Sequence, residues 1–373
     1  MSLSLPADPA RARSLTDVAS QMIAALDGRS EWFSPARSVI AFVIDGLGAR
    51  NLSARAGHAR FLARAGSKRD VACTVFPSTT ASALTSLLTT SPVGRHGIVG
   101  YRALVPGSGD VVNQLRGWDA GELADEWQRA APITAGERRC FAVSKEEYAG
   151  TGFTRVTLVG AEFHGADDLG ERVRLAADLA SRHPGSFTYL YAPELDAIGH
   201  RRGWESDDWV GMLERVDAAV QDLAGSAAAG TGIVVTADHG MVDVPRRRHV
   251  LLAEGDALTE GVRHIGGEPR MLHLYAEADA AGHVLASWRA AEGHRSWVLS
   301  RDEAIGAGLF GPLVDDEVSH RIGDVLVAAR AGIAYYDDRV ADKGPQRMIG
   351  QHGSLTDEER VVPLLRLGAF ATE

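Results

Sequence analysis

Cysteine is scarce in this chain, which has only Cys73 and Cys140 among 373 residues. They do not have the spacing of thiolate metal ligands, and two cysteines cannot build a disulfide framework. Cys73 lies in an apolar run, where we expect a small buried side chain. The sequence therefore excludes the class of small disulfide-stabilised proteins and indicates a reducing compartment.

Long apolar runs and extended basic blocks are also lacking. No apolar run reaches the roughly 18 residues of a membrane-spanning helix. The first eight residues have neither the basic start nor the apolar core of a secretory signal. The net charge of −10 argues against a nucleic-acid polymer as partner. We therefore expect a cytoplasmic protein with no membrane partner; its oligomeric state stays open.

What the chain does contain is a regular alternation of strand and helix patterns. Strand patterns at 38–44, 69–75, 139–143, 155–159, 187–191 and 232–236 alternate with helical patterns near 50–65, 79–90, 119–130, 167–183 and 205–224. Such alternation predicts an α/β fold, a mostly parallel sheet with helices on both faces. A hydrophobic content of 45% is enough for a large core.

The pattern changes after about residue 243, where shorter strands and helices follow a basic triplet. We expect three parts: an N-terminal helical segment (1–35) packed on the core, a catalytic α/β core (36–243 and 346–373), and an inserted α+β cap (244–345). The helical spacing of Ser14–Leu26 supports the first part.

Two apolar runs end in residues that bind metal ions. The run 38–44 is followed by Asp45-Gly46, and the run 232–237 by Asp238-His239-Gly240. Ligand sites in open α/β sheets gather at the carboxyl ends of the strands. Asp45 and Asp238 should therefore lie close together.

A third strand pattern leads to Asp196 and His200, which would share one side of a helix. His352 follows much later, next to a glycine. Each residue alone is common in turns or on surfaces, but together they indicate two adjacent metal sites. Imidazole and carboxylate ligands without thiolate suit zinc best, with manganese or iron as alternatives.

Hydroxyl side chains mark a third feature, the turn after Pro77. Ser78, Thr79 and Thr80 precede a helical pattern, and hydroxyls at a helix start normally cap the helix. The same place suits a nucleophile. A helix N-terminus attracts phosphate, and a metal-bound hydroxyl loses its proton near neutral pH.

The order of these motifs resembles the alkaline phosphatase superfamily, and within it the nucleotide pyrophosphatase/phosphodiesterase branch. The matching pieces are Asp45, Pro77-Ser-Thr-Thr80, His96-Gly-Ile98, Asp196 with His200, Asp238-His239-Gly240 and His352. The resemblance implies an alkaline-phosphatase-like fold with Thr80 as nucleophile and Thr79 as the fallback. It also implies two metal sites, one from Asp45, Thr80, Asp238 and His239, the other from Asp196, His200 and His352.

The activity implied is metal-dependent hydrolysis of a phosphoric ester, foremost a small phosphodiester such as a nucleotide, through a phosphothreonine intermediate and two divalent ions. A phosphomonoesterase, or a phosphotransferase or mutase, could use the same site. A noncatalytic metal-stabilised binding protein is the alternative of another class.

The resemblance implies an asparagine three residues after the nucleophile that helps bind a nonbridging phosphate oxygen, but this chain has Ala83 at that position. A nonbridging phosphate oxygen would then need another partner. The candidates are a backbone amide near Thr80 and the side chains of Tyr101, Arg102 and Arg270.

Overall fold

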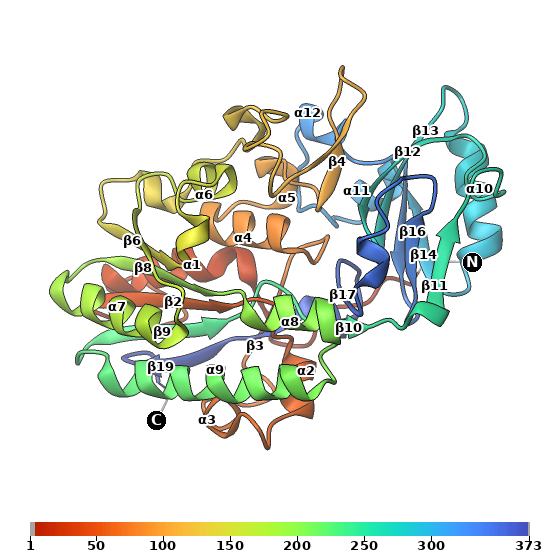
Figure 1. The fold of residues 1–373 in the computed structure, drawn as a ribbon. Helices are drawn as coiled ribbons and strands as arrows, with labels where there is room; N and C mark the ends of the chain where they lie inside the picture. The colour runs from red at the N-terminus through yellow and green to blue at the C-terminus, as the bar shows by residue number, and fades with distance from the viewer. Residues whose placement is uncertain (1–3, 372–373) are drawn as a thin grey trace.

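The centre of the molecule is a six-stranded sheet of order β19-β9-β2-β8-β6-β7 in the computed structural model, which describes residues 4–371 (Figure 1). Five strands are parallel, and β19 pairs antiparallel with β9 at one edge. Every residue of β2, β8 and β9 is buried, as expected for strands covered on both faces. The predicted α/β fold is confirmed. The strands are β2 (Ser38–Ile44), β6 (Cys140–Ser144), β7 (Glu162–Gly165), β8 (Phe187–Ala192), β9 (Thr231–Thr236) and β19 (Leu365–Gly368).

Helices cover both faces of this sheet. α1 (Leu15–Leu26) packs with α4 (Thr80–Thr89) on one face, and α7 (Leu169–Arg182) packs with α9 (Asp207–Ser226) on the other (Figure 1). The side chains of Asp168 and Ser206 cap α7 and α9 by accepting hydrogen bonds from amides of the first turn. The helix expected within the N-terminal segment is therefore present and packs on the core.

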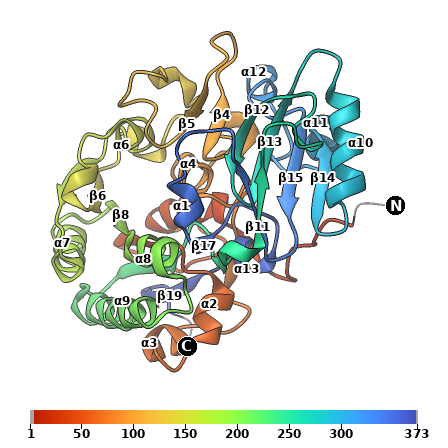
Figure 2. The ribbon, with the colours of Figure 1, turned by 45° about the vertical axis from the view of Figure 1, so that its right-hand side comes forward.

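A second, antiparallel sheet lies beside the first, in the order β12-β13-β15-β14 (Figures 1 and 2). It has its own apolar cluster, which includes Trp288 and Leu274. We propose that this region is the cap expected at 244–345. Its elements are β11 (His249–Leu252), β12 (Val262–Glu268), β13 (Met271–Ala276), α10 (Ala281–Glu292), β14 (Ser296–Ser300), α11 (Arg301–Gly306), α12 (Asp316–Ser319), β15 (Val325–Ala329) and β16 (Ala334–Asp337).

Short elements connect the two sheets. The three-stranded sheet β1-β3-β18 and the pairs β10-β17, β11-β16 and β4-β5 complete the strands. The remaining elements are β1 (Arg13–Ser14), α2 (Ala49–Ala54), α3 (Arg60–Arg64), β3 (Val71–Cys73), α5 (Val93–His96), β4 (Arg102–Leu104), β5 (Val111–Asn113), α6 (Gly152–Thr157), α8 (Glu194–Arg202), β10 (Val242–Asp243), β17 (Gly350–Gln351), α13 (Asp357–Arg360) and β18 (Val361–Pro363), with 3-10 turns at Asp125–Trp127, Ile133–Ala135, Glu146–Tyr148, Arg246–Arg248 and Pro345–Arg347.

Several predicted elements were wrong. The stretch 155–159, predicted as a strand from its β-branched residues, lies largely in α6, where the Thr151 side chain caps the helix and Val156 is buried. The strand in its place is β7, an edge strand with too little apolar character to stand out. The helix expected at 119–130 is mostly turns, and 50–65 divides into α2 and α3. The strand within 69–75 pairs outside the main sheet.

Across residues 4–371, no helix combines the length and the apolar character needed to cross a membrane.

Candidate dimetal site

The carboxyl ends of β2 and β9 bring Asp45, Asp238 and His239 together, as predicted. Their possible ligand atoms lie within 4.8 Å of one another, and all three residues are buried. Asp238 Oδ1 accepts hydrogen bonds from the amides of Gly46 (3.2 Å) and His239 (3.0 Å), which fixes this carboxylate between the two strand ends. Tyr191 donates its hydroxyl hydrogen bond to Asp45 Oδ2. We call this group the first cluster.

The loops that carry the first cluster can approach because they contain glycine. A Cβ on Gly48 or Gly240 would collide with the other glycine or with the carbonyl of Glu358. Asn51 then accepts from the Met241 amide at 3.2 Å and donates to the Met241 carbonyl at 3.1 Å. The glycines after each strand thus allow the two loops to pack closely, and Asn51 holds them in place.

A second cluster joins Asp196 and His200 of α8 to His352, which follows β17. Their ligand atoms also lie within 4.8 Å of one another. Asp196 and His200 share one side of α8, with His200 Nε2 3.3 Å from Asp196 Oδ1. The rings of His352 and His239 stack at a centroid distance of 3.6 Å and an interplanar angle of 13°. The two clusters are therefore immediate neighbours.

The three histidines share one tautomer. Their Nδ1 atoms donate to backbone carbonyls, at 3.1 Å in His239, 2.8 Å in His200 and 3.0 Å in His352. In a neutral ring of this tautomer, the lone pair of Nε2 is available to a metal ion; burial lowers the pKa of His239 and His352 and so favours the neutral form of these two rings. Histidine ligands of metals are normally oriented by this kind of bond at the other ring nitrogen.

Three carboxylate oxygens in the clusters have no hydrogen-bond partner: Asp45 Oδ1, Asp196 Oδ1 and Asp238 Oδ2. Burial raises the pKa of Asp45 well above its usual value, and the nearby charges of Asp238 and Asp196 raise it further. Burial likewise raises the pKa of Asp196 to about 6. Unpaired buried carboxylates facing unprotonated imidazoles are unfavourable unless a cation lies between them. The residues present therefore fit a pair of divalent cations.

The turn Pro77-Ser-Thr-Thr80 is adjacent to the first cluster. We call it the nucleophile turn, after the role that the resemblance implies for Thr80. Thr80 is the first residue of α4, and its Oγ1 lies 3.1 Å from His239 Nε2. The turn is tied to the His352 loop because the Ser78 amide donates to the Gly353 carbonyl at 3.2 Å. Thr79 precedes the helix and makes no such contact with His239. The geometry therefore favours Thr80 over Thr79.

His96, the other histidine of the sequence pattern, lies away from both clusters. Its Nδ1 accepts from the Ile98 amide at 3.1 Å, and its Nε2 lies 2.8 Å from Ser86 Oγ. The ring is fully buried, and burial lowers its pKa to about 3. A neutral ring with both nitrogens bonded is consistent with a structural role.

The structure describes the surroundings of Ala83, which cannot bind phosphate through its side chain, and of Arg270, one of the candidates for that contact. Ala83 belongs to the large apolar core, so a side chain at this position faces the interior. Arg270 is 1% exposed. Its guanidinium donates twice to Glu359, at 2.7 and 2.8 Å, and to three backbone carbonyls. Because these bonds occupy the guanidinium, we leave Arg270 out of the proposed substrate contacts.

Tyr101 and Arg102 are both partly exposed. The Tyr101 amide donates to Glu268 Oε2, and Arg102 donates to the Val111 carbonyl at a long 3.4 Å. These two residues stay candidates for substrate contact.

Sequence reasoning missed two side chains that support the site. Tyr191 was read only as part of a strand, although its hydroxyl contacts Asp45. Glu359 accepts from Arg270 and from the Ser354 amide at 3.0 Å, and its carbonyl accepts from the Gly240 amide at 2.8 Å. No local pattern marks Glu359, because its partners are far away in the sequence.

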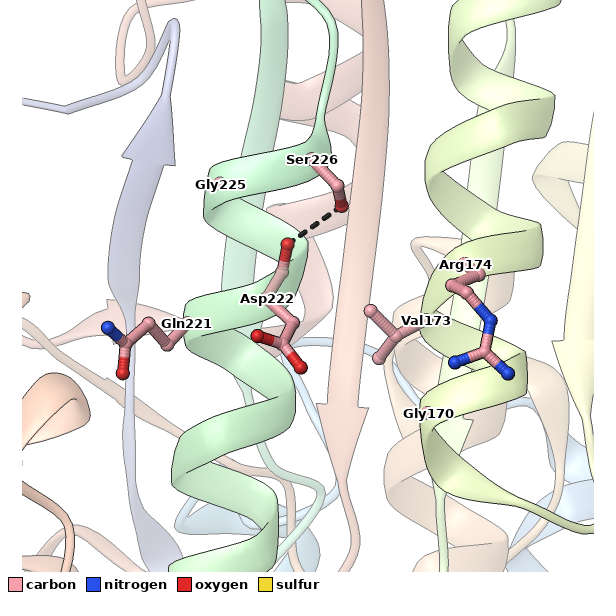
Figure 3. Close-up of a pocket in the computed structure, with 7 residues that line it drawn as sticks. All are labelled: Gly170, Val173, Arg174, Gln221, Asp222, Gly225 and Ser226. Atoms are coloured by element: carbon pink, nitrogen blue, oxygen red, sulfur yellow. Dashed lines mark hydrogen bonds between the residues drawn. The ribbon is translucent and has the colours of Figure 1, made fainter.

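A surface hollow of about 510 Å³ lies elsewhere, between α7 and α9 (Figure 3). Arg174 and Asp222 line it, and none of its lining residues belongs to either cluster. It is open and only weakly enclosed. The chemistry of the side chains, and not the size of a cavity, identifies the site.

The comparisons with known proteins agree with this geometry. Residues 39–355 match the family described as type I phosphodiesterase/nucleotide pyrophosphatase. The chain belongs to this family. It is therefore a member of the alkaline phosphatase superfamily and a hydrolase of phosphoric esters, as the sequence predicted. No curated protein matches the chain in sequence.

Solved structures show the same fold. Murine ectonucleotide pyrophosphatase/phosphodiesterase 5 is similar with a TM-score of 0.68 and 17% identity, over 88% of each chain. Phosphonoacetate hydrolase from Sinorhizobium meliloti 1021, in complex with phosphonoformate, is similar with a TM-score of 0.64 and 21% identity, over 90% of this chain and 91% of the other. An inactive variant of the murine protein is known in complex with AMP.

Proposed function

We propose that this family member is a phosphodiesterase of small, nucleotide-like phosphodiesters, with Thr80 as nucleophile and two divalent cations, zinc foremost, in the two clusters. The observation that carries the proposal is the position of the Thr80 hydroxyl, 3.1 Å from His239 Nε2 and beside buried carboxylate oxygens without partners. A hydroxyl needs such a polarising environment to act as a nucleophile.

The first cluster and Thr80 would hold one cation, and Asp196, His200 and His352 would hold the other. When bound, the two cations would lower the pKa of the Thr80 hydroxyl and of water and would neutralise charge on the phosphoryl oxygens. The net charge of −10 gives no general attraction for an anionic substrate, so attraction would be local.

Thr80 carries the covalent chemistry in two displacements. The Thr80 hydroxyl gives up its proton to solvent as its Oγ1 attacks phosphorus, the Oγ1–P bond forms, and the P–O bond to the leaving alcohol breaks on the opposite side. The alcohol leaves with a proton taken from solvent. Water then attacks phosphorus from the side the alcohol vacated, the Oγ1–P bond breaks, and Thr80 regains a proton. The position of Thr80 at the start of α4 supports this sequence of steps, because the first amides of the helix would lie next to a phosphate attacked by Thr80.

The test compares turnover of bis-p-nitrophenyl phosphate, the p-nitrophenyl ester of thymidine 5′-monophosphate and p-nitrophenyl phosphate. We expect the diesters to be preferred. A large preference for the monoester would replace this proposal with a phosphomonoesterase, and transfer of the phosphoryl group to an alcohol in labelled water would replace it with a phosphotransferase.

Thr80→Ala is the decisive variant. We expect turnover to fall by about 10⁴-fold or more, since loss of a catalytic nucleophile costs several orders of magnitude. Two bound cations per chain should remain, because all six carboxylate and imidazole ligands are untouched. Thr89→Ala is the matched control and should keep most of the activity, because Thr89 is a buried threonine at the other end of α4 whose hydroxyl donates to the Thr85 carbonyl at 2.7 Å. An active Thr80→Ala protein would contradict the nucleophile, and an inactive wild type that binds metal would indicate the noncatalytic alternative.

A further inference from the structure

A carboxyl group of the second sheet reaches the nucleophile turn. Glu268 is the last residue of β12, and it is 6% exposed. Its Oε2 accepts from the Tyr101 amide at 3.1 Å, and the Thr79 hydroxyl faces the same carboxyl group. A Cβ on Gly353 would collide with the Glu268 side chain. Glu268 therefore lies where the nucleophile turn, the Tyr101 loop and the His352 loop meet.

The placement of this side chain has no explanation in the packing of the second sheet. Glu268 Oε1 is buried without a hydrogen-bond partner. Burial of a carboxyl group costs free energy unless its oxygens are paired, and it raises the pKa of Glu268 to about 8. The groups that Glu268 does contact belong to the catalytic core, not to its own sheet.

Thr79 supplies an independent indication. It stands at the N-cap of α4, where a threonine side chain normally accepts a hydrogen bond from the first helical turn. Its side chain makes no such bond. The hydroxyl lies beside the Glu268 carboxyl group instead, so this carboxyl group is placed to hold the residue directly before Thr80.

We propose that Glu268 is a positioning residue, which holds Thr79 and the Tyr101 amide so that the Thr80 hydroxyl stays directed at the reacting phosphorus. Through it, the second sheet forms part of the active site. The inference rests on the proposed function and deepens it. Misplacement of a reacting group by about 1 Å can cost about 100-fold in rate.

The experiment compares Glu268→Ala with Glu268→Gln in the full chain. Alanine removes the acceptor for both partners, and we expect kcat to fall by about 10- to 100-fold with KM within a few fold of wild type and two cations bound. Glutamine keeps an acceptor oxygen of the same reach and should restore kcat to near the wild-type value.

Glu292→Ala is the matched control. Glu292 is another buried acid of the same region, 5% exposed, which accepts from Arg295 at 2.7 Å and from the Tyr335 hydroxyl at 2.5 Å. Its loss should lower thermal stability and leave kcat unchanged. The inference is overturned if Glu268→Ala keeps wild-type kcat, or if its kcat falls no further than that of the control at equal loss of stability.

Failure of the proposed function would look different. If Thr80→Ala keeps its turnover, the nucleophile is misassigned, and the positioning role falls with it. If Thr80→Ala is inactive while Glu268→Ala is fully active, only the role of Glu268 is wrong.

Discussion

The two clusters differ in what surrounds them. The first cluster comes from the ends of the central strands β2 and β9, and Asp45, Asp238 and His239 are at most 3% exposed. In the second cluster the side chains of Asp196 and His200 are 16% and 21% exposed, and the ligands come from a helix and a late loop. The buried cluster adjoins Thr80, the proposed nucleophile, and the other cluster is more open to solvent. The difference in burial suits two roles. The first cluster would hold the nucleophile rigidly, and water and product would pass through the second cluster.

Among changes to the two clusters, the largest effect should follow from breaking the buried cluster. We expect Asp238→Ala to lower kcat by about 10³-fold, since a catalytic cation contributes several kcal/mol to the transition state. The variant should still fold, because it removes a buried charge. His200→Ala should lose less activity and should recover with excess zinc, because water can replace a ligand at the open cluster. The bound metal per chain and kcat, each measured at rising zinc concentration, give the loss of activity and its recovery for both variants. If the two variants lose equal activity, or recover it equally with excess zinc, the proposed difference between the two clusters is wrong.

An intermediate effect should come from the support of the first cluster. Tyr191→Phe removes the hydroxyl that contacts Asp45 Oδ2, and loss of such an outer contact typically costs about 10- to 100-fold in metal affinity or activity. Tyr189→Phe is the control, since Tyr189 stacks on Tyr191 at 5.9 Å but does not bond Asp45. Titration with a competing chelator gives the affinities. Indistinguishable affinities for the two variants would mean that Asp45 needs no support.

The smallest effect concerns pH and metal removal. Without cations the folded pKa of Asp45 is raised above its unfolded value, so the folded state binds more protons and loses stability as pH rises toward that pKa. His239, with a pKa lowered to about 3, acts in the opposite direction, but only below about pH 6.5.

Above about pH 6.5 and below the raised pKa of Asp45, chelation should therefore destabilise the protein more at higher pH, by up to about 1.4 kcal/mol per pH unit for this carboxyl group. Urea unfolding with and without chelator measures this difference. Asp45→Asn should remove the pH dependence of this destabilisation. Asp196→Asn should leave it, because the pKa of Asp196, about 6, lies below this pH range. A chelation effect independent of pH in the wild type would contradict the assignment of the buried cluster.

The sequence by itself determined the parallel sheet and the residues at its strand ends. Short continuous apolar runs rich in β-branched residues are typical of strands covered on both faces, and an acid followed by glycine indicates where such a strand stops. Asp45, Asp238 and His239 were found in this way because their information is local. The stretch 155–159 shows the limit, since β-branched residues entered a helix once a cap and a buried face favoured it.

Only the tertiary structure decided which distant groups meet. The stacking of His239 on His352, the bond from His352 to the Ser78 carbonyl and the contact of Glu268 with the nucleophile turn join segments far apart in the sequence. The same holds for Arg270, a candidate substrate contact whose guanidinium is occupied by Glu359. Such contacts depend on how the two sheets pack together, and periodicity within a segment has no information about that packing.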